Sequence, residues 1–204
     1  ALCTRRGLAA LQDRGLDLGR PVYLLSMGKA ALAMAEQALQ LCEVEDGIVH
    51  CFEEGRLGPL VLERCGHPLP VAEAAQQGRR MLDFALSLGA GDTVVALVSG
   101  GASAMLELPA AGLELDDLRR TGSVLLACGA DIAEVNAVRR CLSRLKGGGL
   151  LAALHPAAVF NVVLSDVPGL PPQVVSSGPT LPPHSVPDAR DVVERYGLWE
   201  QLPA

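Results

Sequence analysis

Lysine is scarce in this chain. Only two of its 17 basic residues, Lys29 and Lys146, are lysines, and arginine fills the other positions. Each lysine stands next to glycine, in Gly28-Lys29 and in Lys146-Gly147-Gly148. The compact ammonium of lysine acts as a point charge on a phosphate or carboxylate, a role that the planar arginine fork does not reproduce. The distribution therefore favours two anion-contacting lysines on glycine loops, with chance in an arginine-rich composition as the alternative.

Aromatic residues, basic runs and long apolar runs are also missing. Aromatics make up 3% of a chain that is 50% hydrophobic, so its core must consist of leucine, valine and alanine. The net charge of −6 and the lack of a basic run argue against nucleic-acid binding, because a phosphate backbone requires a basic surface. No run reaches the roughly 18 apolar residues of a membrane span, so we expect no membrane partner. The lack of a GxGxxG motif argues against a nicotinamide enzyme.

The cysteines form no CxxC pair, and most lie within apolar stretches. This pattern favours small buried side chains in a reducing cytosol over a metal site or a set of disulfides. We therefore predict a cytoplasmic protein with free thiols. The six residues are Cys3, Cys42, Cys51, Cys65, Cys128 and Cys141.

Strand and helix patterns alternate along the chain, which predicts parallel strands joined by right-handed crossovers. The expected fold is α/β: an open, doubly wound, mostly parallel sheet in a Rossmann-like α/β/α sandwich, with residues 1–204 as a single domain. The expected strands are 21–26, 47–51, 60–64, 93–98 and 158–164. The expected helices are 2–11, 29–41, 73–88, 114–126, 132–140, 150–154 and 188–196.

Three polar loops follow predicted strands. They are Met27-Gly28-Lys29, the segment 99–103 and Ser165-Asp166. Ligands of doubly wound folds bind at the carboxyl ends of the strands, so these loops are expected to converge on one edge of the sheet. Lys29 falls in the first turn of the expected helix, where the helix dipole disfavours a cation, and this suggests an anionic ligand. A lysine that points into water is the alternative.

The segment Ser99-Gly100-Gly101-Ala102-Ser103 joins a buried strand to an expected helix start. Its glycines permit close approach and positive φ, so that amide groups and the two serine hydroxyls can surround an anion. Neither the Walker A pattern nor GxGxxG is present, and a plain tight turn explains the segment equally well.

Asn136, Arg139, Arg140 and Ser143 share one face of a predicted helix that leads into residues 146–149. This face is either solvated or part of an anion site that includes Lys146, Gly147 and Gly148.

Asp166 ends an apolar strand, where an aspartate can bind Mg²⁺, accept a proton or cap the loop.

These segments, taken in order, resemble the amino-terminal domain of the glycerate 2-kinases of the MOFRL type, from about residue 21 to residue 196. The motifs are Gly28-Lys29-Ala30-Ala31, His67-Pro68-Leu69-Pro70, Ser99-Gly100-Gly101-Ala102-Ser103, Asn136 to Arg139, Ser143 to Gly148, Ser165-Asp166-Val167-Pro168-Gly169 and Ser176-Ser177-Gly178-Pro179-Thr180.

The resemblance implies ATP-dependent phosphorylation of D-glycerate to 2-phosphoglycerate, with Mg²⁺ as cofactor. It implies that Lys29 is catalytic or contacts phosphate, and that residues 99–103 hold a phosphate or the substrate carboxylate. Lys146 would add positive charge, and Asp166 would be the partner of Mg²⁺ or of the reacting hydroxyl. It also implies a second domain, with the active site in the cleft between the two.

Two departures from the family pattern bear on this expectation. Leu170-Pro171-Pro172-Gln173 stands where the family has acidic residues, and the chain stops at Ala204, without the carboxyl-terminal domain. The chain is then a fragment, a truncated product or a stand-alone domain, and either the missing domain, a partner chain or a homo-oligomer would complete the cleft. The alternatives are a non-catalytic nucleotide- or glycerate-binding domain and an unrelated α/β enzyme of the reductase or phosphosugar type.

Overall fold

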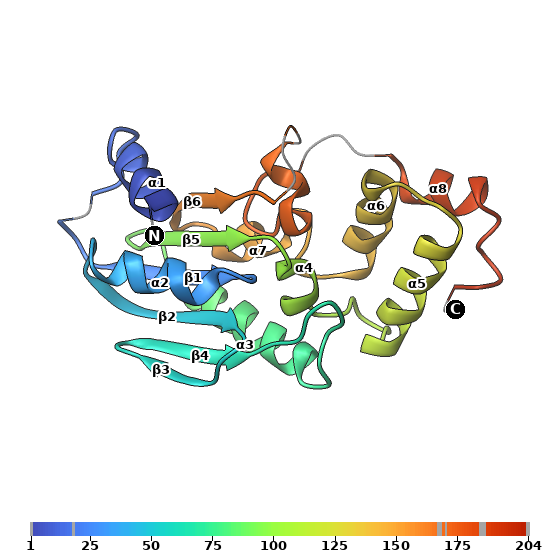
Figure 1. Ribbon diagram of the computed structural model, residues 1–204, viewed down its shortest axis with the longest axis horizontal. Coiled ribbons are helices and arrows are strands. Elements are labelled where there is room, and N and C mark those ends of the chain that lie inside the picture. Colours follow the sequence, from blue (N-terminus) through green and yellow to red (C-terminus); the bar gives the residue numbers. More distant parts are fainter. Residues whose placement is uncertain (1, 18, 167–168, 170, 184–186, 203–204) are drawn as a thin grey trace.

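Apolar runs of valine and leucine form the centre of a six-stranded sheet with the order β3-β4-β2-β1-β5-β6 (Figure 1). The computed structural model describes residues 2–17, 19–166, 169, 171–183 and 187–202. The strands are β1 (Val22–Met27), β2 (Val44–Cys51), β3 (Gly55–Leu57), β4 (Leu60–Arg64), β5 (Thr93–Ser99) and β6 (Ala158–Leu164). All neighbouring pairs are parallel except β3 with β4. The predicted mostly parallel α/β fold is confirmed.

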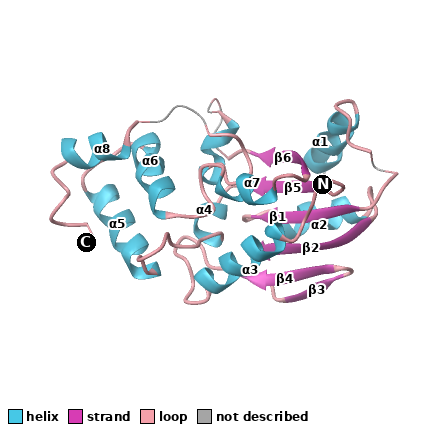
Figure 2. Ribbon diagram, turned by 180° about the vertical axis from the view of Figure 1, so that it is seen from behind, coloured by secondary structure: helices cyan, strands magenta, loops and turns pink. Residues whose placement is uncertain are grey.

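Helices cover both faces of the sheet, and the alternation of side chains along each strand explains how. In β1, Leu24 packs with α1 and α2 on one face, while the next residue, Leu25, packs with α3 and α7 on the other. Figure 2, turned by 180° from Figure 1, shows the face of the sheet that α3 and α7 cover. The helices are α1 (Leu2–Gln12), α2 (Ala31–Leu39), α3 (Ala74–Leu86), α4 (Ala102–Met105), α5 (Leu115–Ala127), α6 (Ile132–Leu142), α7 (Gly149–Leu154) and α8 (Ala189–Arg195), with a 3-10 segment, η1 (Pro172–Ser177).

Helices α5, α6 and α8 form a core of their own beyond the carboxyl ends of the strands (Figure 1). Leu125, Val138 and Val193 are buried where the three helices meet. The sequence predicted these helices but not that they would leave the sandwich. We call them the helical unit, and it forms one wall of the site described below.

The structure differs from the predicted elements at several points, among them the unpredicted 3-10 segment η1 and the start of β2 at Val44 in place of residue 47. The strand β3 was not predicted, because it has only three residues and lies at the edge of the sheet, antiparallel to β4. The helix expected from residue 29 begins at Ala31, so Lys29 precedes the first turn of α2. Lys29 therefore lies outside the helix, and the helix dipole gives no reason to expect an anion beside it.

The helices in the described part of the chain are too short or too polar to cross a membrane.

Candidate functional site

Two loops meet where the strand order reverses, between β1 and β5. Gly28 follows β1 with φ +112°, and a Cβ at this position would lie 2.4 Å from the backbone oxygen of Ser99. The Lys29 amide donates to the Gly100 carbonyl at 3.0 Å, and the Ala30 amide donates to Ser99 Oγ at 3.1 Å. Glycine at position 28 thus permits the close approach, and the hydrogen bonds hold the two loops together.

The Lys29 side chain extends over the second loop. A Cβ on Gly101 would lie 2.9 Å from Lys29 Cε and 3.0 Å from His67 Cδ2. Gly101, with φ 89°, also precedes the first residue of α4 and provides no side-chain cap for that helix. A glycine at this position therefore lets the exposed Lys29 ammonium and the exposed His67 imidazole lie close to the turn.

Asp166 joins the same cluster from the end of β6. Its carboxylate lies against the backbone of the second loop, because a Cβ on Gly100 would lie 1.9 Å from Oδ2. The side chain of Asp166 is exposed. The predicted convergence of Lys29, Ser99 and Asp166 on one edge of the sheet is confirmed.

His67 is a site residue that the sequence analysis did not select as a candidate. It follows β4 and lies within electrostatic reach of both Lys29 and Asp166. Burial and the Lys29 ammonium lower the pKa of His67, while Asp166 opposes the shift, so the imidazole is mainly neutral at pH 7. The signal in the sequence was Gly66-His67-Pro68 directly after a strand.

Serine side chains connect the second loop to η1 and to α6. Ser103 Oγ lies 3.1 Å from Ser177 Oγ, and Ser177 Oγ donates to Asn136 Oδ1 at 2.9 Å. Ser176 Oγ donates to the backbone oxygen of Ser99 at 2.9 Å. Both Ser176 and Ser177 have positive φ, of 53° and 62°. Asn136 is 4% exposed, so in this structure it accepts the hydrogen bond from Ser177 within the protein and positions that serine.

The structure places Lys146, Gly147 and Gly148 differently from the surface anion loop that the sequence suggested. Lys146 is buried, and its ammonium forms an ion pair with Glu107. The amides of Gly147 and Gly148 donate to the carbonyls of Ser177 and Gly178 at 2.8 and 2.9 Å. These groups are engaged inside the protein, and their direct contact with a substrate stays a prediction.

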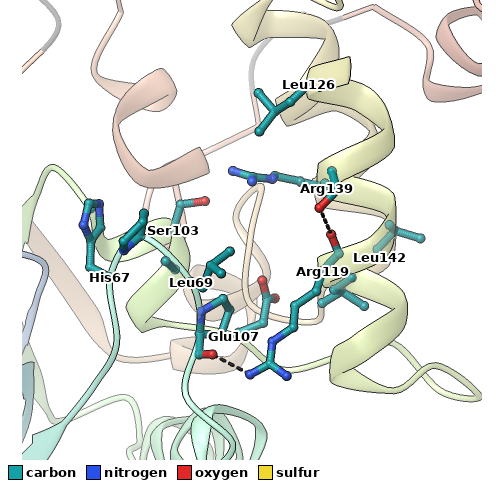
Figure 3. Close-up of a pocket in the computed structure, with 15 residues that line it drawn as sticks. His67, Leu69, Ser103, Glu107, Arg119, Leu126, Arg139 and Leu142 are labelled. Carbon is teal, nitrogen blue, oxygen red and sulfur yellow. Dashed lines mark hydrogen bonds between the residues drawn. The ribbon is translucent and has the colours of Figure 1, made fainter. Parts of the chain in front are cut away.

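A pocket with a volume of about 170 Å³ opens beside Gly101 and Ser103 (Figure 3). One wall comes from the loop after β4 and from α4, and the other comes from α5 and α6 of the helical unit. His67 and Arg139 lie on opposite sides, with Ser103 and Glu107 between them. Ligand pockets for larger molecules typically measure about 300–1,000 Å³, so this one suits a small metabolite.

Arg139 supplies positive charge to this pocket. Burial lowers the pKa of its guanidinium, and Glu107 opposes that shift, yet an arginine stays protonated at neutral pH. The neighbouring Arg140 instead donates to the Gln173 carbonyl at 3.4 Å. Of the two arginines on the predicted helix face that was either solvated or part of an anion site, Arg139 lines the pocket and Arg140 does not.

Within the described residues, no cluster of three or more histidine, cysteine, aspartate or glutamate side chains could bind a metal alone. Asp166 is therefore a single carboxylate beside the two loops. Val167 and Pro168 of the motif that begins at Ser165, and Leu170 of the departure from the family pattern, lie outside the described residues.

A family match covers nearly the whole chain. Residues 3–204 match the family described as a domain of unknown function, DUF4147. The chain belongs to this family.

Relatives of the chain include proteins named for glycerate phosphorylation. It is 39% identical over 189 residues to the D-glycerate 2-kinase of Thermotoga maritima, covering 90% of this chain and 45% of that protein. It is 35% identical over 212 residues to the human glycerate kinase, covering 95% of this chain and 40% of that protein. The chain spans about half the length of the curated relatives that it matches.

The fold agrees with a solved structure of the same kind. A crystal structure of a glycerate kinase from Thermotoga maritima superposes with a TM-score of 0.85 at 37% identity, over 96% of this chain and 48% of that chain. The resemblance stated from the motifs is confirmed.

Proposed function

We propose that this chain is a glycerate kinase domain, which phosphorylates D-glycerate to 2-phosphoglycerate with ATP as the phosphoryl donor. The observation that carries the proposal is the convergence of Lys29, the 99–103 loop and Asp166 beside a small pocket that holds Arg139. The named relatives support the reaction class, and the agreement in fold supports the same arrangement of the site.

Phosphoryl transfer requires positioning and neutralisation of charge more than covalent help from the protein. The Lys29 ammonium would offset charge on the transferred phosphoryl group, and the amides of residues 99–103 would hold phosphate oxygens. Ser99, Gly100, Gly101 and Ser103 contribute this loop. Arg139 would bind the glycerate carboxylate through its planar fork.

His67 is the group best placed to receive a hydrogen bond from the reacting hydroxyl. Its depressed pKa keeps a ring nitrogen available as an acceptor at neutral pH. The Lys29 side chain also lies beside Gly101, so the hydroxyl and the phosphoryl group would meet next to this glycine.

A divalent cation fits the donor set beside the second loop. Mg²⁺ is usually bound through one or two carboxylates, together with substrate phosphates and water. Asp166 supplies one exposed carboxylate at the phosphate end of the site, and it would hold Mg²⁺ there. The bound ion would neutralise charge on the ATP phosphates.

A non-catalytic nucleotide- or glycerate-binding domain is the second candidate, because the matched relatives are about twice as long as this chain. We propose that the chain forms the amino-terminal domain of a two-domain kinase, with the other half or a second copy contributing to the cleft. A cytoplasmic location belongs to the same proposal.

The decisive experiment combines an activity assay with calorimetry on the same sample. The protein should convert D-glycerate to 2-phosphoglycerate only when both ATP and Mg²⁺ are present. Binding of ATP and glycerate without turnover would favour the second candidate, and binding of neither would reject both.

A further inference from the structure

A buried carboxylate in the pocket wall has one oxygen without a hydrogen bond. Glu107 is 6% exposed, and its Oε2 pairs with the Lys146 ammonium. Its Oε1 has no hydrogen-bond partner among the described residues. A buried acceptor without a donor is unfavourable, and native proteins rarely keep one without a ligand or water to satisfy it.

The surroundings of Glu107 form a built site with a net positive charge. Glu107 carries one negative charge, and the neighbouring Lys146 and Arg139 carry one positive charge each. Arg139 makes no hydrogen bond or ion pair within the described part of the chain, although Glu107 is near enough to act on it electrostatically. The ion pair with Lys146 thus holds the Glu107 carboxylate in place, while its Oε1 and the Arg139 guanidinium remain without hydrogen-bond partners among the described residues.

A free acceptor beside a free guanidinium matches a small acid that also carries a hydroxyl group. The guanidinium donates to the carboxylate of the ligand, and the hydroxyl of the ligand donates to the glutamate. Figure 3 shows His67 and Arg139 on opposite sides of Ser103. His67 lies with Lys29 beside Gly101, where the proposed function has the phosphoryl group transferred. The hydroxyl near Glu107 is therefore the one that is not phosphorylated.

We propose that Glu107 determines substrate specificity by accepting a hydrogen bond at Oε1 from the 3-hydroxyl of D-glycerate, while Arg139 binds the carboxylate. This inference rests on the proposed function, because that function identifies the 2-hydroxyl as the reacting group. Lys146 serves the same purpose indirectly, as the ion-pair partner that fixes the position of Glu107 within the wall.

The test compares two ligands that differ only at the 3-position. D-Lactate has the carboxylate and the 2-hydroxyl of D-glycerate but lacks the 3-hydroxyl. Calorimetric dissociation constants are measured for both ligands with the wild-type protein and with the Glu107→Leu/Lys146→Met double variant. The double variant removes both buried charges together, and such replacements are often neutral or stabilising.

The wild-type protein should bind D-glycerate at least about tenfold more tightly than D-lactate, and the double variant should bring this ratio to within about threefold of one. The double variant also removes the negative charge of Glu107 beside Arg139. This change affects the binding of the D-glycerate and D-lactate carboxylates equally, so it cancels in the ratio of the two dissociation constants. A ratio that stays the same in the variant overturns the inference and leaves the proposed function intact.

Two further readouts keep the test decisive. If circular dichroism shows that the double variant does not fold, Glu107→Gln takes its place, with an expected fall of the ratio by a factor of three or more. Failure of the wild-type protein to bind D-glycerate at all would overturn both the inference and the proposed function.

Discussion

At the scale of single residues, the two lysines have opposite environments. Lys29 is exposed above Gly101, whereas Lys146 is buried against Glu107. The sequence singled out both because each stands next to glycine. Burial separates their roles: the exposed ammonium can meet a phosphate, and the buried one neutralises a carboxylate within the protein.

Replacing Lys29 with alanine should lower kcat/KM for glycerate phosphorylation at least about tenfold, because the ammonium offsets charge that develops in transfer. Steady-state kinetics measure the effect. Arg20→Ala is the matched control, since Arg20 is a highly exposed cation that forms an ion pair with the exposed Asp17. Equal turnover in the Lys29 variant and the wild type would contradict the role given to Lys29.

Gly100→Ala and Gly28→Ala form a contrasting pair. The new methyl group at position 100 meets the movable end of the Asp166 side chain, so activity should fall at least about tenfold while unfolding free energy changes by less than about 1 kcal/mol. The methyl group at position 28 meets the Ser99 backbone in a left-handed conformation, so stability should fall by more than about 1 kcal/mol.

Urea denaturation and kinetics separate the effects in this pair. A Gly100→Ala variant that is as active as the wild type would show that the position of Asp166 does not matter for the reaction.

At the scale of elements, hydrogen bonds at the start of α6 fix the position of this helix, which carries Arg139. The Asp131 side chain accepts hydrogen bonds from the amides of Ala133 and Glu134 at 2.8 and 2.9 Å. The Glu134 side chain accepts one in return from the Asp131 amide at 3.0 Å, completing a capping box. Glu134 also pairs with Arg195 and Tyr196 at the end of α8, so one carboxylate fixes both helices.

Asp131→Ala should therefore reduce the unfolding free energy by about 1 kcal/mol, the usual cost of a lost cap. The KM for glycerate should also rise, because α6 positions Arg139. Urea denaturation and kinetics measure the two effects. Asp188→Ala, which removes the cap of α8 instead, is the matched control, and it should destabilise the protein without a comparable rise in KM.

Elements with strong local signals could be predicted from the sequence, and long-range features could not. The apolar strand at 93–98 and the helix expected over 188–196 were predicted and appear in the structure as β5 and α8. The strand β3 is too short to show a period, and the pairing of Glu107 with Lys146 joins residues 39 positions apart. The loops of the site were found because all of them follow parallel strands.

At the scale of the whole molecule, one buried network ties together four elements around the sheet. His50 of β2 contacts the Met105 carbonyl of α4 at 3.0 Å and Glu63 of β4 at 3.0 Å. Arg80 of α3 pairs with the same glutamate. Burial raises the pKa of Glu63, but hydrogen bonds and charges from His50 and Arg80 outweigh it and leave that pKa below 4.5.

This shift predicts a pH dependence of stability. A depressed pKa in the folded state stabilises the protein above pH 4.5, and the contribution is lost as the pH falls through the folded-state pKa. Glu63→Gln should be less stable than the wild type at pH 7, and the difference should shrink below pH 4. Urea denaturation across this range measures it. Asp116→Asn changes an exposed carboxylate and should show no such convergence, and a constant difference for Glu63→Gln would contradict the assignment.

The pocket is shared between two cores that pack independently, since His67 and Gly101 belong to the sheet and Arg139 belongs to the helical unit. A small tilt of α5 and α6 against the strands would widen the gap between guanidinium and imidazole while leaving the contact between the Gly28 and Ser99 loops untouched. Substitutions in the core of the helical unit should therefore weaken the binding of glycerate before they weaken the binding of ATP.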